Sequence, residues 1–126
     1  DEDFTIIAAL HCGWRGTKDG IIENTIAELC KHVKAEKLTA YIGPTIQQQY
    51  YEVGSEFNEY FDSEYIKQTN GKYYFNLNGR IEDILVNSGI GRVMNSRMGT
   101  FGVPDHFYSY RRDGETGRMC AFIGLV

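Results

Sequence analysis

Two adjoining stretches near the start of the chain decide the fold: Phe4–Leu10 (FTIIAAL) and, directly after it, residues 11–16 (HCGWRG). The first predicts a buried strand, because short continuous hydrophobic runs bounded by turn residues are typical of covered strands. The two glycines of the second predict a sharp turn in which the backbone can approach a ligand closely. The strand would fix the imidazole of His11, and the turn carries Arg15, whose guanidinium is suited to phosphate or carboxylate. We therefore predict a functional site at this turn.

The composition is that of a globular domain. The chain has 126 residues, of which 42% are hydrophobic and 24% charged, which is enough for one domain with a core. The net charge of −4 gives no support to general nucleic-acid binding, and no hydrophobic run approaches the length of a membrane span. The acidic start lacks signal-peptide character, and the three cysteines form no CxxC pair. These features predict a reduced, cytoplasmic setting without a membrane or nucleic-acid partner.

Further along the chain, strand-like and helix-like patterns alternate. The spacing of hydrophobic residues predicts helices over Gly20–Lys34, Tyr51–Phe61 and Asn76–Asn87, the last ended by Gly89. Residues 69–72 are typical of a turn. The sequence predicts further strands at Leu38–Ile42, Tyr73–Phe75, Gly91–Met94 and Met119–Val126. The order indicates an α/β fold, a mixed sheet with flanking helices, within a single domain over residues 1–126.

Arginines and tyrosines gather in the glycine-rich C-terminal part of the chain. The guanidinium group offers a planar fork of donors, which suits phosphate or oxyanion recognition. Tyr108 and Tyr110 alternate with Ser109 as on a strand, so they could form an aromatic wall for a purine or equally part of the core. The arginines concerned, besides Arg15, are Arg111, Arg112 and Arg118. Alternatively, arginines pair with Asp105, Asp113 or Glu115 to hold the C-terminal loop, and we expect that at least one does.

The histidines and cysteines each have a plain structural interpretation. A single histidine at a strand end, such as His11, is often only hydrogen-bonded to a nearby carbonyl. Cys12 is predicted to be a buried small hydrophobe and not a ligand, and Cys30 falls on the hydrophobic face of a predicted helix, in the core. His32 is predicted at the surface and His106 in a solvated loop, with a pocket role as the alternative for His106.

Four motifs follow one another along the chain: HCGWRGT (11–17), IGPTI (42–46), YEVG (51–54) and FYSYRRDGETGR (107–118). Together they resemble the polyphenol oxidase or laccase-domain family, whose members are also described as zinc-dependent purine nucleoside phosphorylases. The resemblance extends over nearly the whole chain and implies the α/β laccase-domain fold. It covers only the C-terminal portion of that fold, so the N-terminal portion is expected to lie outside residues 1–126.

The resemblance also implies a set of site residues. The family's zinc is held by two histidines and a cysteine, of which His11 matches the last, while the other two lie upstream of this chain. We therefore expect no tightly held zinc on residues 1–126 alone. For a phosphorylase we assign catalytic roles to Arg15 and Arg111 and substrate binding to Tyr110, Arg112 and Arg118. We further predict that His11, Arg15, Tyr110 and Arg111 border one common cleft.

Several functions remain open at this point. The first is phosphorolysis of adenosine and inosine by a zinc-dependent enzyme, with related adenosine deamination, impaired in a chain that lacks two metal ligands. Its partners would be a purine nucleoside and phosphate, and the sequence leaves the oligomeric state open. The second is a non-catalytic fragment or a domain completed by a partner. Older family naming implies copper-dependent phenol oxidation, for which three histidines are few. A peptidoglycan-editing hydrolase is a further alternative.

Overall fold

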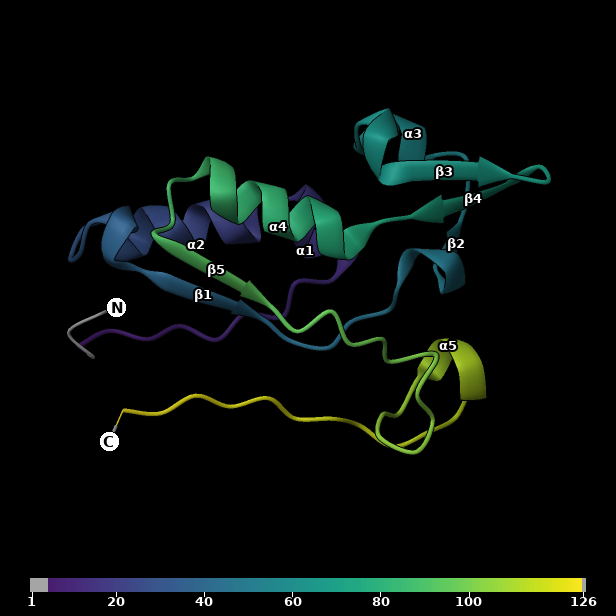
Figure 1. Cartoon of the computed structure of the whole chain (residues 1–126). Helices are drawn as coiled ribbons and strands as arrows, with labels where there is room; N and C mark the ends of the chain where they lie inside the picture. The colour runs from purple at the N-terminus through teal and green to yellow at the C-terminus, as the bar shows by residue number, and fades with distance from the viewer. Residues whose placement is uncertain (1–4, 126) are drawn as a thin grey trace. The chain divides into compact units, whose positions relative to one another are not determined.

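The structure is a computed structural model that describes residues 5–125, and the chain divides into two compact units (Figure 1). Unit 1 consists of Asp1–Ile42, Ile81–Asn95 and Ala121–Val126, and unit 2 of Gly43–Arg80 and Ser96–Cys120. Each is described below by itself. The chain has the predicted mixed α/β fold, with one parallel sheet, one antiparallel sheet and flanking helices. Among the residues described, no helix combines the length and hydrophobicity needed to cross a bilayer.

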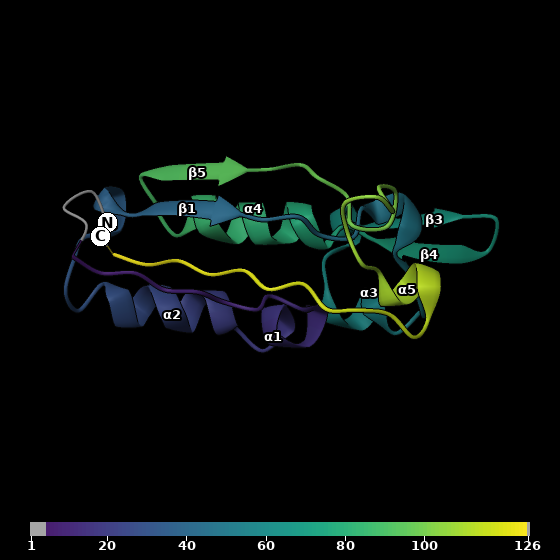
Figure 2. The ribbon, with the colours of Figure 1, turned by 90° about the horizontal axis from the view of Figure 1, so that it is seen from below.

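Unit 1 is built on a two-stranded parallel sheet of β1 (Thr39–Ile42) and β5 (Arg92–Asn95), in which Thr39 is paired with Arg92. Both strands were predicted. Helix α4 lies over one face of this sheet (Figures 1 and 2). The remaining elements of this unit are α1 (Trp14–Lys18), α2 (Ile21–Leu29) and the 3-10 helix η1 (Ala35–Lys37). Its buried hydrophobic residues include Ile22, Leu38, Ile42, Ile81 and Ile84.

The predicted helix at 76–87 is confirmed as α4 (Leu77–Asn87), and its two ends follow from local sequence. The Asn76 side-chain oxygen accepts a hydrogen bond of 3.0 Å from the Gly79 N–H, which satisfies one of the free N–H groups at the helix start. Gly89 follows the last turn at φ 75°, the left-handed conformation that ends helices. Between these ends Leu77, Ile81 and Ile84 are buried on one face.

Replacing Asn76 by alanine should reduce the free energy of unfolding by about 1 kcal/mol, because the α4 cap is lost. Asn76→Asp should retain nearly full stability, since its carboxylate can accept the same hydrogen bond and is favoured at a helix N-terminus. Urea unfolding followed by circular dichroism measures both. Equal losses in the two variants would contradict a capping role.

Unit 2 carries a three-stranded antiparallel sheet in the order β2-β4-β3, formed by Glu52–Val53, Lys72–Phe75 and Ile66–Thr69. Strands β3 and β4 form a hairpin whose two turn residues, Asn70 and Gly71, both have positive φ, at 52° and 75°. Asn-Gly is the preferred pair for such a two-residue turn, so the predicted turn at 69–72 is confirmed. The other elements are η2 (Gln48–Tyr50), α3 (Phe57–Tyr60), η3 (Ser63–Tyr65) and α5 (Tyr110–Asp113).

The core of unit 2 is aromatic. Phe75 on β4 is fully buried, at 0% exposure. Its ring stacks on Phe61 at 4.3 Å between centroids and meets Phe57 edge-on at 5.2 Å. Tyr51 adds a tilted contact at 5.9 Å from Phe75. Four rings from three parts of the chain therefore meet at one point, where each aromatic pair adds to the stability gained from burial.

Two of the predicted helices differ in extent from the prediction. Residues 51–61 form strand β2 and the short helix α3 instead of one helix, and Gly54 lies between the two. The backbone N–H of Phe75 donates to the Tyr51 carbonyl, which draws this segment into the sheet. The helix predicted over 20–34 is confirmed as α2 but ends at Leu29. Strand β3 has no counterpart among the predicted elements.

The strands predicted at 4–10 and 119–126 are wrong over the residues described. Neither Thr5–Leu10 nor Met119–Leu125 forms a strand, while Phe4 and Val126 lie outside the described part of the chain. A hydrophobic run becomes a strand only when a neighbouring strand accepts and donates its ladder hydrogen bonds. The hydrophobic pattern therefore indicated a preference for strand structure, but these residues do not form strands in this chain.

Candidate functional site

The segment that follows Leu10 shapes the surroundings of His11. Gly13 is the residue before α1, and its carbonyl accepts a hydrogen bond of 2.9 Å from the Thr17 N–H. A Cβ atom at Gly13 would lie 3.3 Å from Nε2 of His11, so the exposed imidazole packs against bare backbone. The predicted Gly-Trp-Arg-Gly turn is thus the first turn of a helix, and His11 precedes it without a strand behind it.

Arg15 lies within α1 and is exposed. Its guanidinium carbon is 4.5 Å from the centroid of the Trp14 ring, a cation–π contact. The indole therefore limits the positions of the guanidinium, and the exposed N–H groups remain open to an anion.

Cys12, which was predicted to be a buried small hydrophobe, is only partly buried. Its side chain is half-buried, and burial, with a smaller contribution from Glu23, raises the pKa of the thiol. The prediction for Cys30 is wrong, because it lies exposed at the end of α2, beyond the buried face of the helix.

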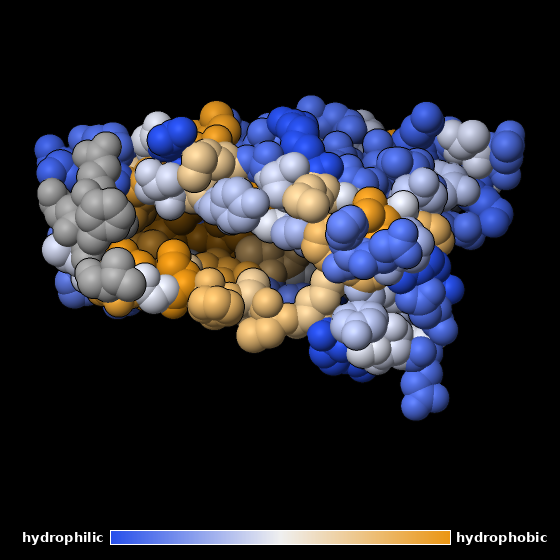
Figure 3. All heavy atoms as spheres, turned by 60° about the horizontal axis from the view of Figure 1, so that its bottom comes forward, coloured by the Kyte–Doolittle hydropathy of each residue, from blue (hydrophilic) through white to orange (hydrophobic). Residues whose placement is uncertain are grey.

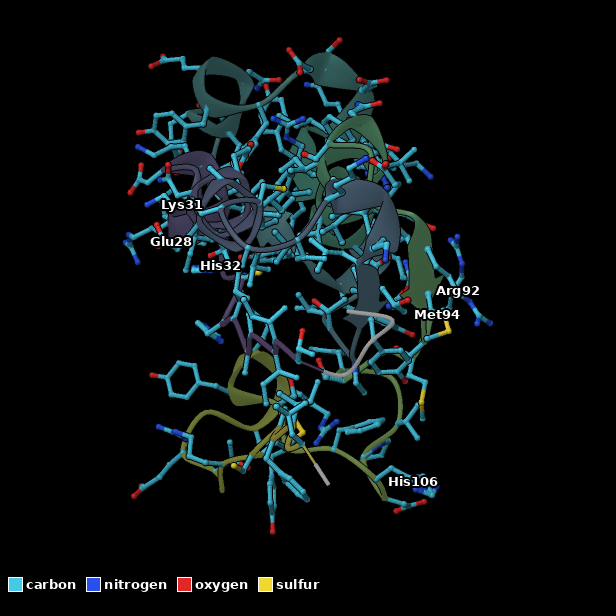
Figure 4. The ribbon with its side chains drawn as sticks, turned by 90° about the vertical axis from the view of Figure 1, so that its left-hand side faces the viewer. Glu28, Lys31, His32, Arg92, Met94 and His106 are labelled. Atoms are coloured by element: carbon cyan, nitrogen blue, oxygen red, sulfur yellow. The ribbon has the colours of Figure 1, made fainter. Side chains whose placement is uncertain are left out.

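The other histidines lie on the surface, as predicted. His32 is exposed beside Glu28 and Lys31 past the end of α2, and His106 is exposed in a loop of unit 2 (Figure 4). Over residues 5–125 no group of three histidine, cysteine, aspartate or glutamate side chains is placed to hold a metal ion. Catalytic zinc sites use three protein ligands. The residues described here therefore do not form the implied zinc site by themselves.

Arg112 holds the C-terminal part of unit 2 together. Nη1 donates to the carbonyls of Thr100 (3.2 Å) and Phe101 (2.9 Å), and Nη2 to that of Phe107 (2.9 Å). Nε and Nη2 also bind the two carboxylate oxygens of Asp113, at 2.7 Å each. The expectation that an arginine pairs with an acid to hold this loop is confirmed. Hydrogen bonds from Arg112 are the main cause that lowers the pKa of the Asp113 carboxyl.

These contacts occupy every donor of Arg112. A guanidinium group has five N–H donors, and the five hydrogen bonds just described use them all. A substrate could accept its own hydrogen bond from Arg112 only by displacing or sharing one that holds the segment from Thr100 to Asp113. The geometry therefore gives Arg112 a holding role in this loop.

Arg111 has a different position. It is exposed, its Nη1 donates to the Glu52 carbonyl at 2.7 Å, and its guanidinium lies 5.4 Å from the centroid of the Tyr51 ring. Its other guanidinium N–H groups have no hydrogen-bond partner between residues 5 and 125. One N–H group of Arg111 is thus held by the backbone, and the other N–H groups can donate to an anion. The sequence had given Tyr51 no role, although the motif YEVG marked it.

The remaining predicted site residues are also exposed. Tyr110 is the first residue of helix α5, so the prediction that Tyr108 and Tyr110 alternate as on a strand is wrong. The Tyr110 side chain is 72% exposed. Arg118 closes the turn after α5 by donating from Nη1 to the carbonyls of Thr116 (3.1 Å) and Gly117 (3.2 Å). A Cβ at Gly117 would lie 2.7 Å from the Tyr108 ring, so a side chain at this position would require that exposed ring to move.

The predicted site residues fall in both units. His11 and Arg15 belong to unit 1, whereas Tyr110, Arg111, Arg112 and Arg118 belong to unit 2. Within unit 2 the structure brings Arg111 to Tyr51 and Glu52. A cleft shared by His11 and Arg111 involves both units and stays a prediction.

Comparison with known proteins identifies relatives across the whole chain. Residues 1–126 match the profile of the family described as multi-copper polyphenol oxidoreductase laccase. The chain is 35% identical to "Purine nucleoside phosphorylase YfiH" of Shigella flexneri over 97% of its own length and 52% of that protein. It is 36% identical to a purine nucleoside phosphorylase of Aquifex aeolicus, over 95% of this chain and 57% of that one.

A solved structure agrees with the sequence comparison. The crystal structure of a Neisseria meningitidis protein superposes with a TM-score of 0.76 at 34% identity, covering 83% of this chain and 46% of that one. The chain thus spans about half the length of these relatives. Because the family profile matches every residue from 1 to 126, this chain belongs to the multi-copper polyphenol oxidoreductase laccase family.

Proposed function

We propose that the protein to which this chain contributes is a zinc-dependent purine nucleoside phosphorylase of the cytoplasm that acts on adenosine and inosine, with adenosine deamination as a related activity. The observation that carries the proposal is identity of 34–36% over nearly the whole chain to proteins named purine nucleoside phosphorylase. The chain matches only half of each of them, so the activity belongs to the assembled protein.

The arginines of this chain suit the phosphorolysis step. In that reaction a phosphate oxygen forms a bond to the ribose C1′ while the bond from C1′ to the purine nitrogen breaks. The electron pair leaves with the purine, which takes up a proton, and ribose 1-phosphate remains. Arg111, with its free N–H groups, and the exposed Arg15 would hold the phosphate by charge-assisted hydrogen bonds. The exposed ring of Tyr110 would stack on the purine. Arg118 would also contribute to substrate binding.

His11 is assigned to the metal. It would supply one zinc ligand through its imidazole, and the other ligands would come from polypeptide outside this chain. The roles given above to the arginines do not depend on the metal. Arg112 is left to hold the loop from which Arg111 and Tyr110 project, because its five donors are already bonded.

Replacing Arg111 by alanine should raise the KM for phosphate by roughly 10-fold or more, because charge-assisted donors to the anion are lost. The assay uses a joined protein, in which the half of the Shigella flexneri relative that this chain does not match is fused to residues 1–126. Release of hypoxanthine from inosine is measured against phosphate concentration. The KM for inosine should change less than the KM for phosphate.

The controls separate anion binding from general charge. Arg92→Ala removes another exposed arginine, from β5, and should leave the KM for phosphate unchanged (Figure 4). Arg111→Lys should recover part of the affinity, because a lysine keeps the charge without the planar fork. Base release that does not depend on phosphate, or oxidation of catechol in its place, would overturn the proposed function.

A further inference from the structure

Glu52 on strand β2 of unit 2 contacts two cations through two different groups. Its backbone carbonyl accepts the hydrogen bond of 2.7 Å from Nη1 of Arg111, and its carboxylate accepts one of 2.9 Å from Nζ of Lys72. Among the described residues of unit 2, the carboxylate forms an ion pair with Lys72 and none with Arg111. Glu52 therefore holds Arg111 by its backbone alone and leaves the remaining N–H groups of that arginine open.

The register of the sheet places Lys72 where it can hold this carboxylate. Glu52 is paired with Tyr74 on β4, and Lys72 lies two residues before Tyr74 on the same strand. Residues two apart on a strand share a face, and a diagonal neighbour on the next strand is within reach of a long side chain. The hydrogen bond with Glu52 is also the main cause that raises the pKa of the Lys72 ammonium, so that this group is charged at neutral pH.

A carboxylate beside an arginine with open donors competes with any other anion. Carboxylate and phosphate oxygens accept the same charge-assisted hydrogen bonds from a guanidinium group. The Arg111 guanidinium cannot move far from Glu52, because its Nη1 is bonded to the Glu52 carbonyl and its centre lies 5.4 Å from the centroid of the Tyr51 ring. Without its lysine partner, the Glu52 side chain is free to adopt another rotamer and to compete for the open N–H groups.

The ion pair of Lys72 and Glu52 lies in solvent. The exposed fractions of the two side chains are 56% for Lys72 and 47% for Glu52. At the right of Figure 3, where Figure 1 places the β3–β4 hairpin, the surface is mainly hydrophilic. Exposed ion pairs add little to folding stability, so the main consequence of this pair is the charge that it leaves beside Arg111.

We propose that Lys72 is a positioning residue for the anion site at Arg111: it binds the Glu52 carboxylate and keeps it away from the N–H groups that bind phosphate. Lys72 acts through Glu52 and needs no contact of its own with the anion. The inference rests on the proposed function in that phosphate is taken as the anion at Arg111. It extends the site from the arginine to the two strands that present it, β2 and β4.

A titration of the chain with inorganic phosphate, followed by side-chain NMR, tests the proposal. The Nε–H signal of Arg111, assigned from its loss in Arg111→Lys, reports the binding. Lys72→Ala should weaken phosphate binding at Arg111 by about 3-fold, the size expected for a change in one exposed ion pair. The double variant Lys72→Ala/Glu52→Gln should bind phosphate as the unmodified chain does, because a neutral amide is a weaker acceptor than a carboxylate.

Lys67→Ala is the matched control for a general effect of charge. Lys67 is an exposed lysine on β3, directly opposite Tyr74 and therefore on the same face of the sheet as Lys72. Its loss should leave phosphate binding unchanged, and equal weakening in Lys67→Ala and Lys72→Ala would overturn the proposal.

A second measurement needs no phosphate. The Nε–H signal of Arg111 should shift in Lys72→Ala, where the Glu52 carboxylate reaches the guanidinium, and should return to its original position in Lys72→Ala/Glu52→Gln. An unchanged signal in Lys72→Ala would contradict the proposed competition.

These outcomes separate the inference from the proposed function. Equal phosphate binding at Arg111 with and without Lys72 would overturn the inference and leave the role of Arg111 in phosphorolysis intact. An Arg111 signal that does not respond to phosphate in the unmodified chain would also overturn it, because Lys72 would then have no anion site to keep open. A joined protein that releases no base from inosine, although Arg111 binds phosphate with the expected dependence on Lys72, would contradict the proposed function alone.

Discussion

Phe75→Ala is expected to lower the free energy of unfolding of the chain by about 3–5 kcal/mol, the largest loss from any single substitution considered. Phe75 is fully buried, and its ring contacts those of Phe57, Phe61 and Tyr51. Removing it takes away the buried ring and leaves a cavity among the others. Urea unfolding followed by tyrosine fluorescence measures the loss, because the nine tyrosines report on their surroundings.

Two further variants show whether the loss comes from the core. Phe75→Leu should cost clearly less than Phe75→Ala, because most of the volume remains. Tyr110→Ala removes a ring that is largely exposed and should change stability by less than about 0.5 kcal/mol. A loss at Phe75 no larger than that at Tyr110 would mean that the four rings do not form the core of unit 2.

Arg112→Ala is expected to lower the melting temperature by on the order of 5 °C, whereas Arg111→Ala should shift it by about 1 °C or less. The two residues are adjacent arginines, but Arg112 makes five hydrogen bonds and Arg111 makes one. Loss of Arg112 removes the donor to three carbonyls and two hydrogen bonds to the Asp113 carboxylate. Differential scanning calorimetry measures both shifts, and similar shifts would contradict the separate roles.

Arg112→Lys should not restore stability, because an ammonium group has three donors and cannot reproduce the planar fork. Acidification gives an independent check. The pKa of the Asp113 carboxyl lies below its ordinary value of 3.8, mainly because of hydrogen bonds from Arg112. The pair therefore contributes its stability above that ordinary value and loses it as the pH falls through the lowered pKa. Asp113→Asn should remove this part of the acid dependence, and an unchanged acid transition would contradict the pairing.

Elements with strong local signals could be predicted from sequence. Helix α4 has a capping asparagine, a buried face and a terminating glycine, all within a few residues of one another. The β3–β4 turn is an Asn-Gly pair, and its geometry follows from the two residues themselves. Strand β3, by contrast, has only Ile66 as a large hydrophobic residue, so its pattern gave no signal.

Elements that depend on distant partners could not be predicted in this way. Residues 5–10 have a strand pattern, but a strand also needs a neighbour, which the pattern does not specify. The same holds for the candidate site. Sequence identified Arg111 and Arg112 as one cluster, and only their contacts separate an arginine with open donors from one whose five donors are bonded. Tyr51 gains a role only because folding places its ring beside Arg111.

The contact between Gly13 and His11 has a consequence for how this sequence can vary. Since a Cβ at position 13 would lie 3.3 Å from Nε2 of His11, a side chain there would require the exposed imidazole to shift slightly. The two positions are therefore mutationally coupled: Gly13→Ala acts through His11 and should have little further effect once His11 is replaced. The glycine therefore influences the orientation of the His11 imidazole, although it contributes no functional group of its own.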